Sequence, residues 1–172
     1  MENVSWNDAM AFSEMLNGRG MEPSGWEFTL PAETQWEYAA GGGNKSKGYK
    51  YSGSDNVEDV AWYDDNSGNK THPVRQKKAN GLGMHDMSGN IWEWCLDDWQ
   101  ISSNHTPEFT RGNVRNIMSP ERVCRGGDWY GSARSPFSCS FGTDHQKRSR
   151  GNCEKIRFPR LFILKNRGTV LY

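Results

Sequence analysis

Glycine and tryptophan place the strongest constraint on what this chain can fold into, because its 172 residues include 19 glycines and 8 tryptophans. Glycine permits positive φ and close backbone approach, and each tryptophan ring buries a large area. Only 34% of the residues are hydrophobic, so a few rings must supply much of the buried surface. We therefore expect a loop-rich domain pinned by tryptophans, since disordered chains are poor in such rings.

Length and charge narrow the class of protein. A chain of 172 residues suits one compact domain, so we expect a single domain over residues 1–172. The 21 basic residues balance 21 acidic ones, which argues against the basic field of a nucleic-acid partner. No apolar run approaches the roughly 20 residues of a membrane span, and the first residues do not resemble a signal peptide. The sequence assigns no compartment.

Two short helices are predicted near the start of the chain. Ser5 and Asp8 form a capping box, and an apolar stripe of helical spacing follows. This pattern predicts a helix over residues 6–17 with a left-handed stop at Gly18. Alternating residues predict a strand over 26–30, after which Pro31 favours entry into a second helix over residues 32–40.

The rest of the chain shows little regular period. Residues 41–121 are rich in Gly, Asn, Asp and Ser, which predicts irregular loops with short strands, and loops this long are usually functional or stabilised by ions. A strand is expected near Val123, and a final strand is expected over about residues 156–164. The predicted fold class is therefore α+β.

Cysteine, histidine and basic residues give weaker signals. The four cysteines form no CxxC pair, so a zinc ribbon or thioredoxin motif is excluded and three disulfide pairings stay open beside buried thiols. No two of the four histidines have the spacing that places a metal pair on one helix face. Lys147, Arg148 and Arg150 form a local basic patch that is typical of a solvated loop.

Two stretches are rich in oxygen ligands. Within residues 86–94, two carboxylates flank a Gly-Asn turn, and this mixture of hard ligands suits calcium. Residues 56–59 together with 64–66 form a second such stretch. Neither has the spacing of an EF-hand, and the second stretch fits ordinary Asx-turns as well as a metal site.

Four motifs appear in an order that resembles the formylglycine-generating enzyme (sulfatase-modifying factor) family. They are Val-Ser-Trp-Asn-Asp-Ala at 4–9, Leu-Pro-Ala-Glu-Thr-Gln-Trp-Glu-Tyr-Ala-Ala at 30–40, the block from Asn-Gly to Trp-Glu-Trp at 80–94, and Arg-Gly-Gly-Asp-Trp at 125–129. The resemblance covers nearly all of the chain. It implies a C-type-lectin-like fold with two short helices, short strands and extensive irregular loops.

The same resemblance implies structural calcium. By position, one cage would use the side chains of Asp86 and Glu93 with the carbonyls of Gly89 and Ile91. A second cage would use Asn56, the carbonyl of Val57, and Asp64 or Asn66.

Departures from the family concern its catalytic copper site. In the family, two cysteines after the Arg-Gly-Gly-Ser element bind copper and activate oxygen. Those positions fall here at about Gly131 and Pro136, and Asp128 stands in place of the serine. Because Cu(I) requires soft ligands, we expect neither copper nor formylglycine activity. The alternative is a copper-dependent oxidoreductase that uses Cys139 and Cys153 in a rearranged site.

A non-catalytic branch offers a different function. The chain resembles the variable, ligand-binding proteins that retroelements diversify, in which the region after Arg-Gly-Gly-x-Trp displays side chains on a rigid frame. Residues 128–155 mix aromatic and adaptable polar groups of the kind that binding loops favour. The candidate ligand-binding residues, for an unknown protein or small molecule, are Asp128, Tyr130, Ser132, Arg134, Ser135, Phe137, Ser138, Phe141, Thr143, Asp144 and His145. The alternative is an inert loop.

The ends of the chain also depart from the family. The family's domain begins well before the Val-Ser-Trp element, so we expect an N-terminally truncated domain that lacks the usual first strands. The terminal strands of this fold pair with each other, so the final strand would expose an edge unless a partner chain covers it. Pro159, which removes a hydrogen-bond donor from that strand, fits an edge or a bulge.

Overall fold

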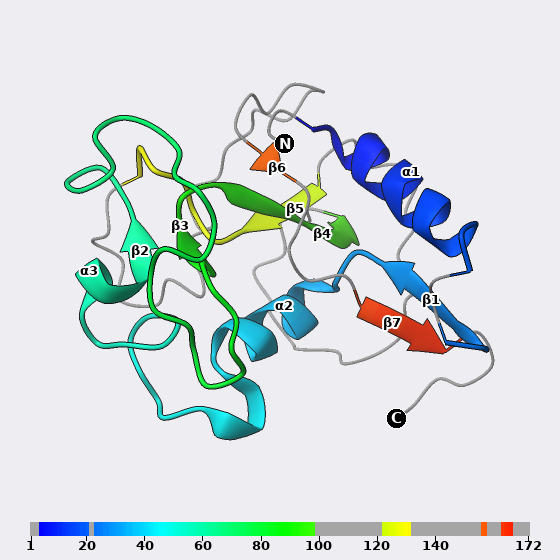
Figure 1. Ribbon diagram of the computed structural model, residues 1–172, viewed down its shortest axis with the longest axis horizontal. Coiled ribbons are helices and arrows are strands. Elements are labelled where there is room, and N and C mark those ends of the chain that lie inside the picture. Colours follow the sequence, from blue (N-terminus) through cyan, green and yellow to red (C-terminus); the bar gives the residue numbers. More distant parts are fainter. Residues whose placement is uncertain (1–3, 21–22, 99–121, 132–155, 158–162, 167–172) are drawn as a thin grey trace. The chain divides into compact units, whose positions relative to one another are not determined.

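The computed structural model of the chain describes residues 4–20, 23–98, 122–131, 156–157 and 163–166 (Figure 1). The fold mixes a few short helices with short strands, as the sequence predicts for an α+β protein. The chain forms two compact units, the first of residues 1–34, 94–123 and 147–172, and the second of residues 35–93 and 124–146. The expectation of one domain over the whole chain stays a prediction. No helix within the described ranges is long and apolar enough to cross a membrane.

Helix α1, Trp6–Asn17, has the predicted bounds because its capping box forms as the sequence indicates. The Ser5 hydroxyl accepts from the Asp8 amide at 3.1 Å, and the Asp8 carboxylate accepts from the Ser5 amide at 2.9 Å. These bonds to Ser5 lower the pKa of Asp8. The predicted left-handed stop at Gly18 is wrong, since Gly18 stays right-handed at φ −71° and its N–H still bonds to the helix. The positive φ comes two residues later, at Gly20.

Strand β1, Trp26–Thr29, pairs antiparallel with β7, Ile163–Asn166, in a register that joins Trp26 to Asn166. The Asn17 side chain, on α1, makes the two hydrogen bonds that a residue of a neighbouring strand would make. It accepts from the Phe28 amide at 2.6 Å and donates to the Phe28 carbonyl at 3.0 Å. The end of α1 is thereby fixed to β1.

The predicted final strand over 156–164 is wrong as one continuous element. It is divided into β6, Ile156–Arg157, and β7, and β6 joins β4, Trp92–Asp98, and β5, Arg122–Arg125, in a sheet of order β5-β4-β6. Because β7 pairs with β1, one of its edges is covered within the chain. A partner chain along the other edge stays a prediction, and Pro159 lies outside the described residues.

Tryptophan indoles tie backbone segments of the first unit together, as the composition predicts. The Trp6 indole donates to the Cys95 carbonyl at 2.9 Å, and the Trp94 indole donates to the Val4 carbonyl at 3.0 Å. Each ring therefore joins parts of the chain about 90 residues apart. A loop-rich unit gains long-range order in this way without a large sheet.

The second unit contains most of α2, Glu33–Ala40, which buries Trp36, Ala39 and Ala40 and closely matches the predicted helix. It also contains elements that the sequence did not predict: the 3-10 helix η1, Gly43–Lys45, the single-turn helix α3, Val57–Val60, and the parallel pair of β2, Ala61–Trp62, with β3, Ser88–Gly89. Long irregular segments join them (Figure 1).

Candidate functional site

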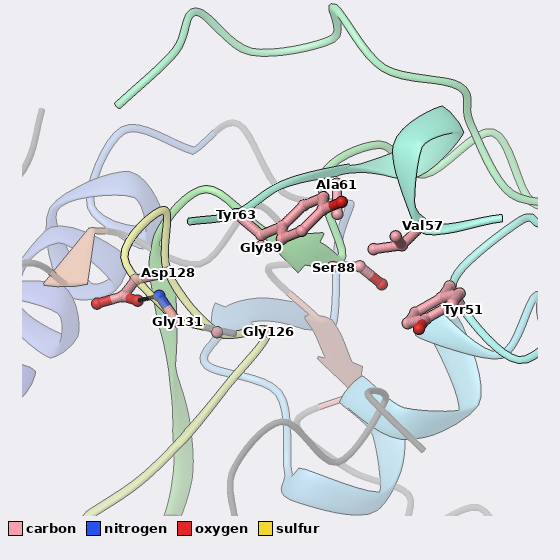
Figure 2. A pocket seen from close by; sticks show the side chains of 10 residues that line it. Tyr51, Val57, Ala61, Tyr63, Ser88, Gly89, Gly126, Asp128 and Gly131 are labelled. Carbon is pink, nitrogen blue, oxygen red and sulfur yellow. Dashed lines mark hydrogen bonds between the residues drawn. The ribbon is translucent and has the colours of Figure 1, made fainter. Parts of the chain in front are cut away.

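A small hollow in the second unit collects residues from several of these segments (Figure 2). It holds little more than a water-sized space. Its lining consists of Tyr51, Val57, Ala61, Tyr63, Ser88, Gly89, Gly126, Gly127, Asp128 and Gly131.

One side of the hollow is a turn of residues 128–131, which we call the display turn. The Asp128 carboxylate accepts from the Gly131 amide at 2.7 Å (Figure 2). It also accepts from the Tyr130 amide at 3.2 Å, and the two bonds close the turn locally. The Tyr130 side chain is 66% exposed. Its ring meets the Trp129 ring edge to face at 5.7 Å.

Distant segments hold the backbone of the display turn. The Trp129 amide donates to the Asn90 carbonyl at 3.0 Å, and the Ser67 hydroxyl donates to the Trp129 carbonyl at 2.9 Å. The Asp64 amide donates to the Gly131 carbonyl at 3.3 Å. The turn is therefore fixed by the chain while Tyr130 points into solvent.

The support for this turn is residues 80–93, which we call the frame. The Asn90 side chain accepts from the His72 amide at 3.0 Å and donates to the His72 carbonyl at 3.1 Å. The Asn90 amide donates to the Trp62 carbonyl at 2.7 Å. Asn90 is 1% exposed, and it joins the segments of Trp62 and His72 to the display turn.

Gly89 permits the closest backbone approach in the frame. It has φ +72°, and a Cβ at this position would lie 2.2 Å from the Trp62 carbonyl oxygen. Its amide donates to the Gly126 carbonyl at 2.6 Å. Only glycine fits here, because any side chain would collide with β2.

Asn80, at the other end of the frame, is 8% exposed and uses its whole amide group. Its nitrogen donates to the carbonyls of Ala39 and Ala40 at 2.8 and 3.2 Å and to the Ser52 hydroxyl at 3.1 Å. Its oxygen accepts from the amides of Leu82 and Met84 at 3.0 and 3.1 Å. Asn80 therefore anchors the end of α2 to the loop that precedes β3.

The residues of the first predicted calcium cage lie in the frame and bond to the chain itself. Glu93 is 1% exposed and accepts from the Trp36 indole at 3.0 Å. Asp86 accepts from the Arg75 amide at 2.9 Å, and the Gly89 carbonyl accepts from the Ile91 amide at 3.0 Å. Oxygen ligands of this kind suit calcium, and calcium at this place stays a prediction.

The second predicted cage has the bonds of caps and Asx-turns. Asn56 accepts from the Glu58 amide at 3.3 Å and so caps α3, whose first residue is Val57. Asp64 accepts from the Asp65 amide at 3.1 Å. These bonds fit the Asx-turn alternative. The parts of the chain that the structure describes hold no group of three or more His, Cys, Asp or Glu side chains suited to a metal.

Tyr63 and Glu58 form a pair that sequence reasoning missed. The Tyr63 hydroxyl donates to Glu58, and the Asn66 side chain donates to the same carboxylate at 3.1 Å. The bond from Tyr63, and then that from Asn66, lowers the pKa of Glu58, while the bond to Glu58 raises the pKa of Tyr63. Spacing gave no signal, because Tyr63 faces back along the chain from the end of β2.

The structure describes only part of the predicted ligand-binding set. Asp128 closes the display turn and Tyr130 projects from it. Outside the described residues lie Ser132, Arg134, Ser135, Phe137, Ser138, Phe141, Thr143, Asp144 and His145.

Gly131, which the family resemblance predicts to stand at about one of the two cysteine positions, lines the hollow. Among the described residues, the lining includes no cysteine. Cys95 is buried in β4 and Cys124 is half-buried in β5. Pro136, Cys139 and Cys153 lie outside the described residues.

Comparisons with known proteins identify the class. Residues 1–157 match the family model for the sulfatase-modifying factor enzyme 1-like domain. The chain therefore belongs to this family, as its motifs indicate.

The relatives that match this chain carry names that describe different functions. The chain is 37% identical over 152 residues to the chaperone protein LppX of Paenibacillus barcinonensis, covering 78% of this chain and 46% of that protein. It is 30% identical over 140 residues to the formylglycine-generating enzyme of Streptomyces coelicolor, covering 74% and 41%. The structure of Treponema denticola variable protein 1 matches with a TM-score of 0.53 and 40% identity, covering 66% and 40%. The chain spans less than half the length of each.

Proposed function

We propose that this chain is a non-catalytic binding module on a lectin-like frame, which presents its binding surface on the display turn and the residues that follow it. One observation supports the proposal: Gly131, which the family resemblance places at about one of the two cysteine positions, lines the hollow beside Asp128. A glycine offers no sulfur to copper, so this position cannot supply half of a two-thiolate site.

The architecture around Tyr130 supports recognition of a ligand. Its backbone neighbours are held by Asn90, Ser67 and Asp64, while its ring is 66% exposed. A rigid aromatic group on a fixed turn loses little conformational freedom on binding, which is why such residues often dominate interfaces. The ligand would be a protein or a small molecule.

A pair of matched variants tests this proposal. Tyr130→Ala removes the projecting ring, and Tyr38→Ala removes a ring of similar exposure, 62%, from α2. Peptides selected from a random library on the unaltered protein should bind Tyr130→Ala about tenfold or more weakly, the effect of losing an interface anchor. Tyr38→Ala should bind them within about twofold. Equal affinity for both variants would contradict the proposal.

The alternative function is a copper-dependent oxidoreductase. It is considered because the Streptomyces protein with 30% identity is named as a formylglycine-generating enzyme. In this chain, the alternative would require thiols from residues beyond Gly131, such as Cys139 and Cys153. An activity assay separates it from binding, because a binding module leaves a cysteine peptide unchanged.

Calcium is a separate proposal that rests on the family resemblance. Asp86, Glu93 and the carbonyls of Gly89 and Ile91 would hold the ion. Titration of the metal-stripped protein with calcium should then change tryptophan fluorescence in a saturable way, since Trp36 donates to Glu93. A flat titration would exclude calcium at this place.

A further inference from the structure

A second hollow in the second unit lies away from the display turn and shares no lining residue with the first. It opens between the segment after α2 and the segment before β3, and it encloses about 490 Å³ of space that is partly continuous with solvent. Its lining consists of Gly41, Lys45, Ser46, Lys47, Tyr49, Gly53, Lys78, Ala79, Asn80 and Gly81.

The walls of this hollow are fixed by the chain. Gly81 approaches η1 so closely that a Cβ there would lie 2.5 Å from the Lys45 carbonyl oxygen. Asn80 is anchored by the five hydrogen bonds described above, and the Lys78 amide donates to the Asp59 carbonyl at 2.8 Å. The hollow is therefore part of the folded unit, and its backbone does not have to be ordered by a ligand.

Three lysines, Lys45, Lys47 and Lys78, line this hollow, and no acidic residue does. Within the described residues, their ammonium groups form no ion pair and no hydrogen bond. Their neighbours behave differently: the Lys77 ammonium donates to the Glu58 carbonyl at 2.7 Å and lies 4.0 Å from the Trp62 ring centre, and Lys50 lies over the Tyr51 ring. The three lysines around the hollow are thus uncommitted among the described residues.

The polar side chains of the lining are mainly donors. The three ammonium groups and the Ser46 hydroxyl can donate to a ligand, whereas the Asn80 side-chain amide already forms hydrogen bonds within the protein. Lysine binds phosphate as a compact point charge, and several ammonium groups around one cavity favour a dianion. The half-exposed Tyr49 ring on the wall offers an apolar surface to an attached organic group.

We propose that this hollow binds the phosphate group of a small phosphate monoester, with Lys45, Lys47 and Lys78 around the dianion and Tyr49 against its organic part. This ligand site is independent of the display turn. Its failure would leave the proposed binding function of that turn untouched.

Isothermal titration of the full chain with phenyl phosphate tests the site. Binding should saturate, and the Lys45→Gln/Lys47→Gln/Lys78→Gln variant should bind about tenfold or more weakly, since it loses every ammonium group of the lining. A matched variant, Arg19→Gln/Lys70→Gln/Arg75→Gln, removes the same charge from exposed positions outside the hollow and should bind as the unaltered protein does. The melting temperature of each variant confirms folding, and Lys78→Glu alone should weaken binding if the triple variant does not fold.

Two further ligands separate the contribution of the dianion charge from that of the organic group against Tyr49. Phenyl sulfate carries one negative charge and should bind more weakly than phenyl phosphate, and inorganic phosphate should also bind more weakly because it has nothing to place against Tyr49. Absence of saturable phenyl phosphate binding, or equal weakening in both triple variants, would overturn the proposal. Equal affinity for phenyl sulfate would overturn the charge argument, and equal affinity for inorganic phosphate would overturn the role given to Tyr49.

Discussion

The frame and the display turn, both in the second unit, differ in the exposure of their side chains. In the frame, polar side chains such as Asn80, Asn90 and Glu93 are buried and bonded to the chain. In the display turn, the backbone is bonded in a similar way, yet the Tyr130 side chain is left to solvent. The comparison teaches that buried polar networks can fix the backbone of a loop without a large sheet, while a side chain of that loop stays exposed.

The sharpest way to break the frame is at Gly89. Gly89→Ala should lower the free energy of unfolding by about 4 kcal/mol or more, because it adds a clash with the Trp62 carbonyl to a positive φ. Gly83→Ala is the control, since Gly83 has φ +78° with nothing near its Cβ position, and it should cost about 1 kcal/mol. Urea unfolding of both variants measures the difference, and similar midpoints would show that the close approach at Gly89 does not matter.

A nearly isosteric change tests the buried amide at the start of the frame. Asn80→Asp replaces a donor with an oxygen that faces the carbonyls of Ala39 and Ala40, so it should cost about 3 kcal/mol of unfolding free energy. Asn44→Asp makes the same chemical change at an exposed position of η1 and should stay within about 0.5 kcal/mol. The Asn80 effect should shrink in acid, where the carboxyl is protonated; a loss no greater than that of Asn44→Asp would contradict the role of Asn80.

Of these changes, loss of the Tyr130 side chain from the display turn should have the smallest effect on the free energy of unfolding. Tyr130→Ala should lower the free energy of unfolding by about 1 kcal/mol or less, because the side chain is largely exposed and an edge-to-face pair such as that with Trp129 contributes about this much. Thermal unfolding checks this value. A loss as large as that of Asn80→Asp would mean that Tyr130 belongs to the frame, and the contrast between the two regions would fail.

Sequence reasoning succeeded where the signal is local or aromatic. The Ser5–Asp8 capping box fixed the start of α1, and the glycines after Ala40 marked the end of α2. The motifs at 80–94 and 125–129 identified the family. Each of these signals depends on neighbours within a few residues or on a block long enough to be specific.

The missing elements depend on contacts between distant segments. The pairing of β2 with β3 consists of two residues in each strand and has no periodicity to detect. Asn80 acquires its role only when α2 and Ser52 lie beside it. Lys45 and Lys78 are far apart in the chain and share a hollow because Gly81 admits the Lys45 backbone. Such contacts follow from the fold, and the spacing of residues in the sequence does not predict them.

The central claim is that this member of the family recognises a ligand and does not oxidise cysteine. Its most direct test incubates the full chain with copper, oxygen and a peptide that carries a sulfatase-type cysteine motif, with the Streptomyces coelicolor relative as positive control, and weighs the peptide by mass spectrometry. Our account predicts an unchanged cysteine with this chain and an aldehyde with the control. Conversion of the cysteine to formylglycine by this chain would contradict it.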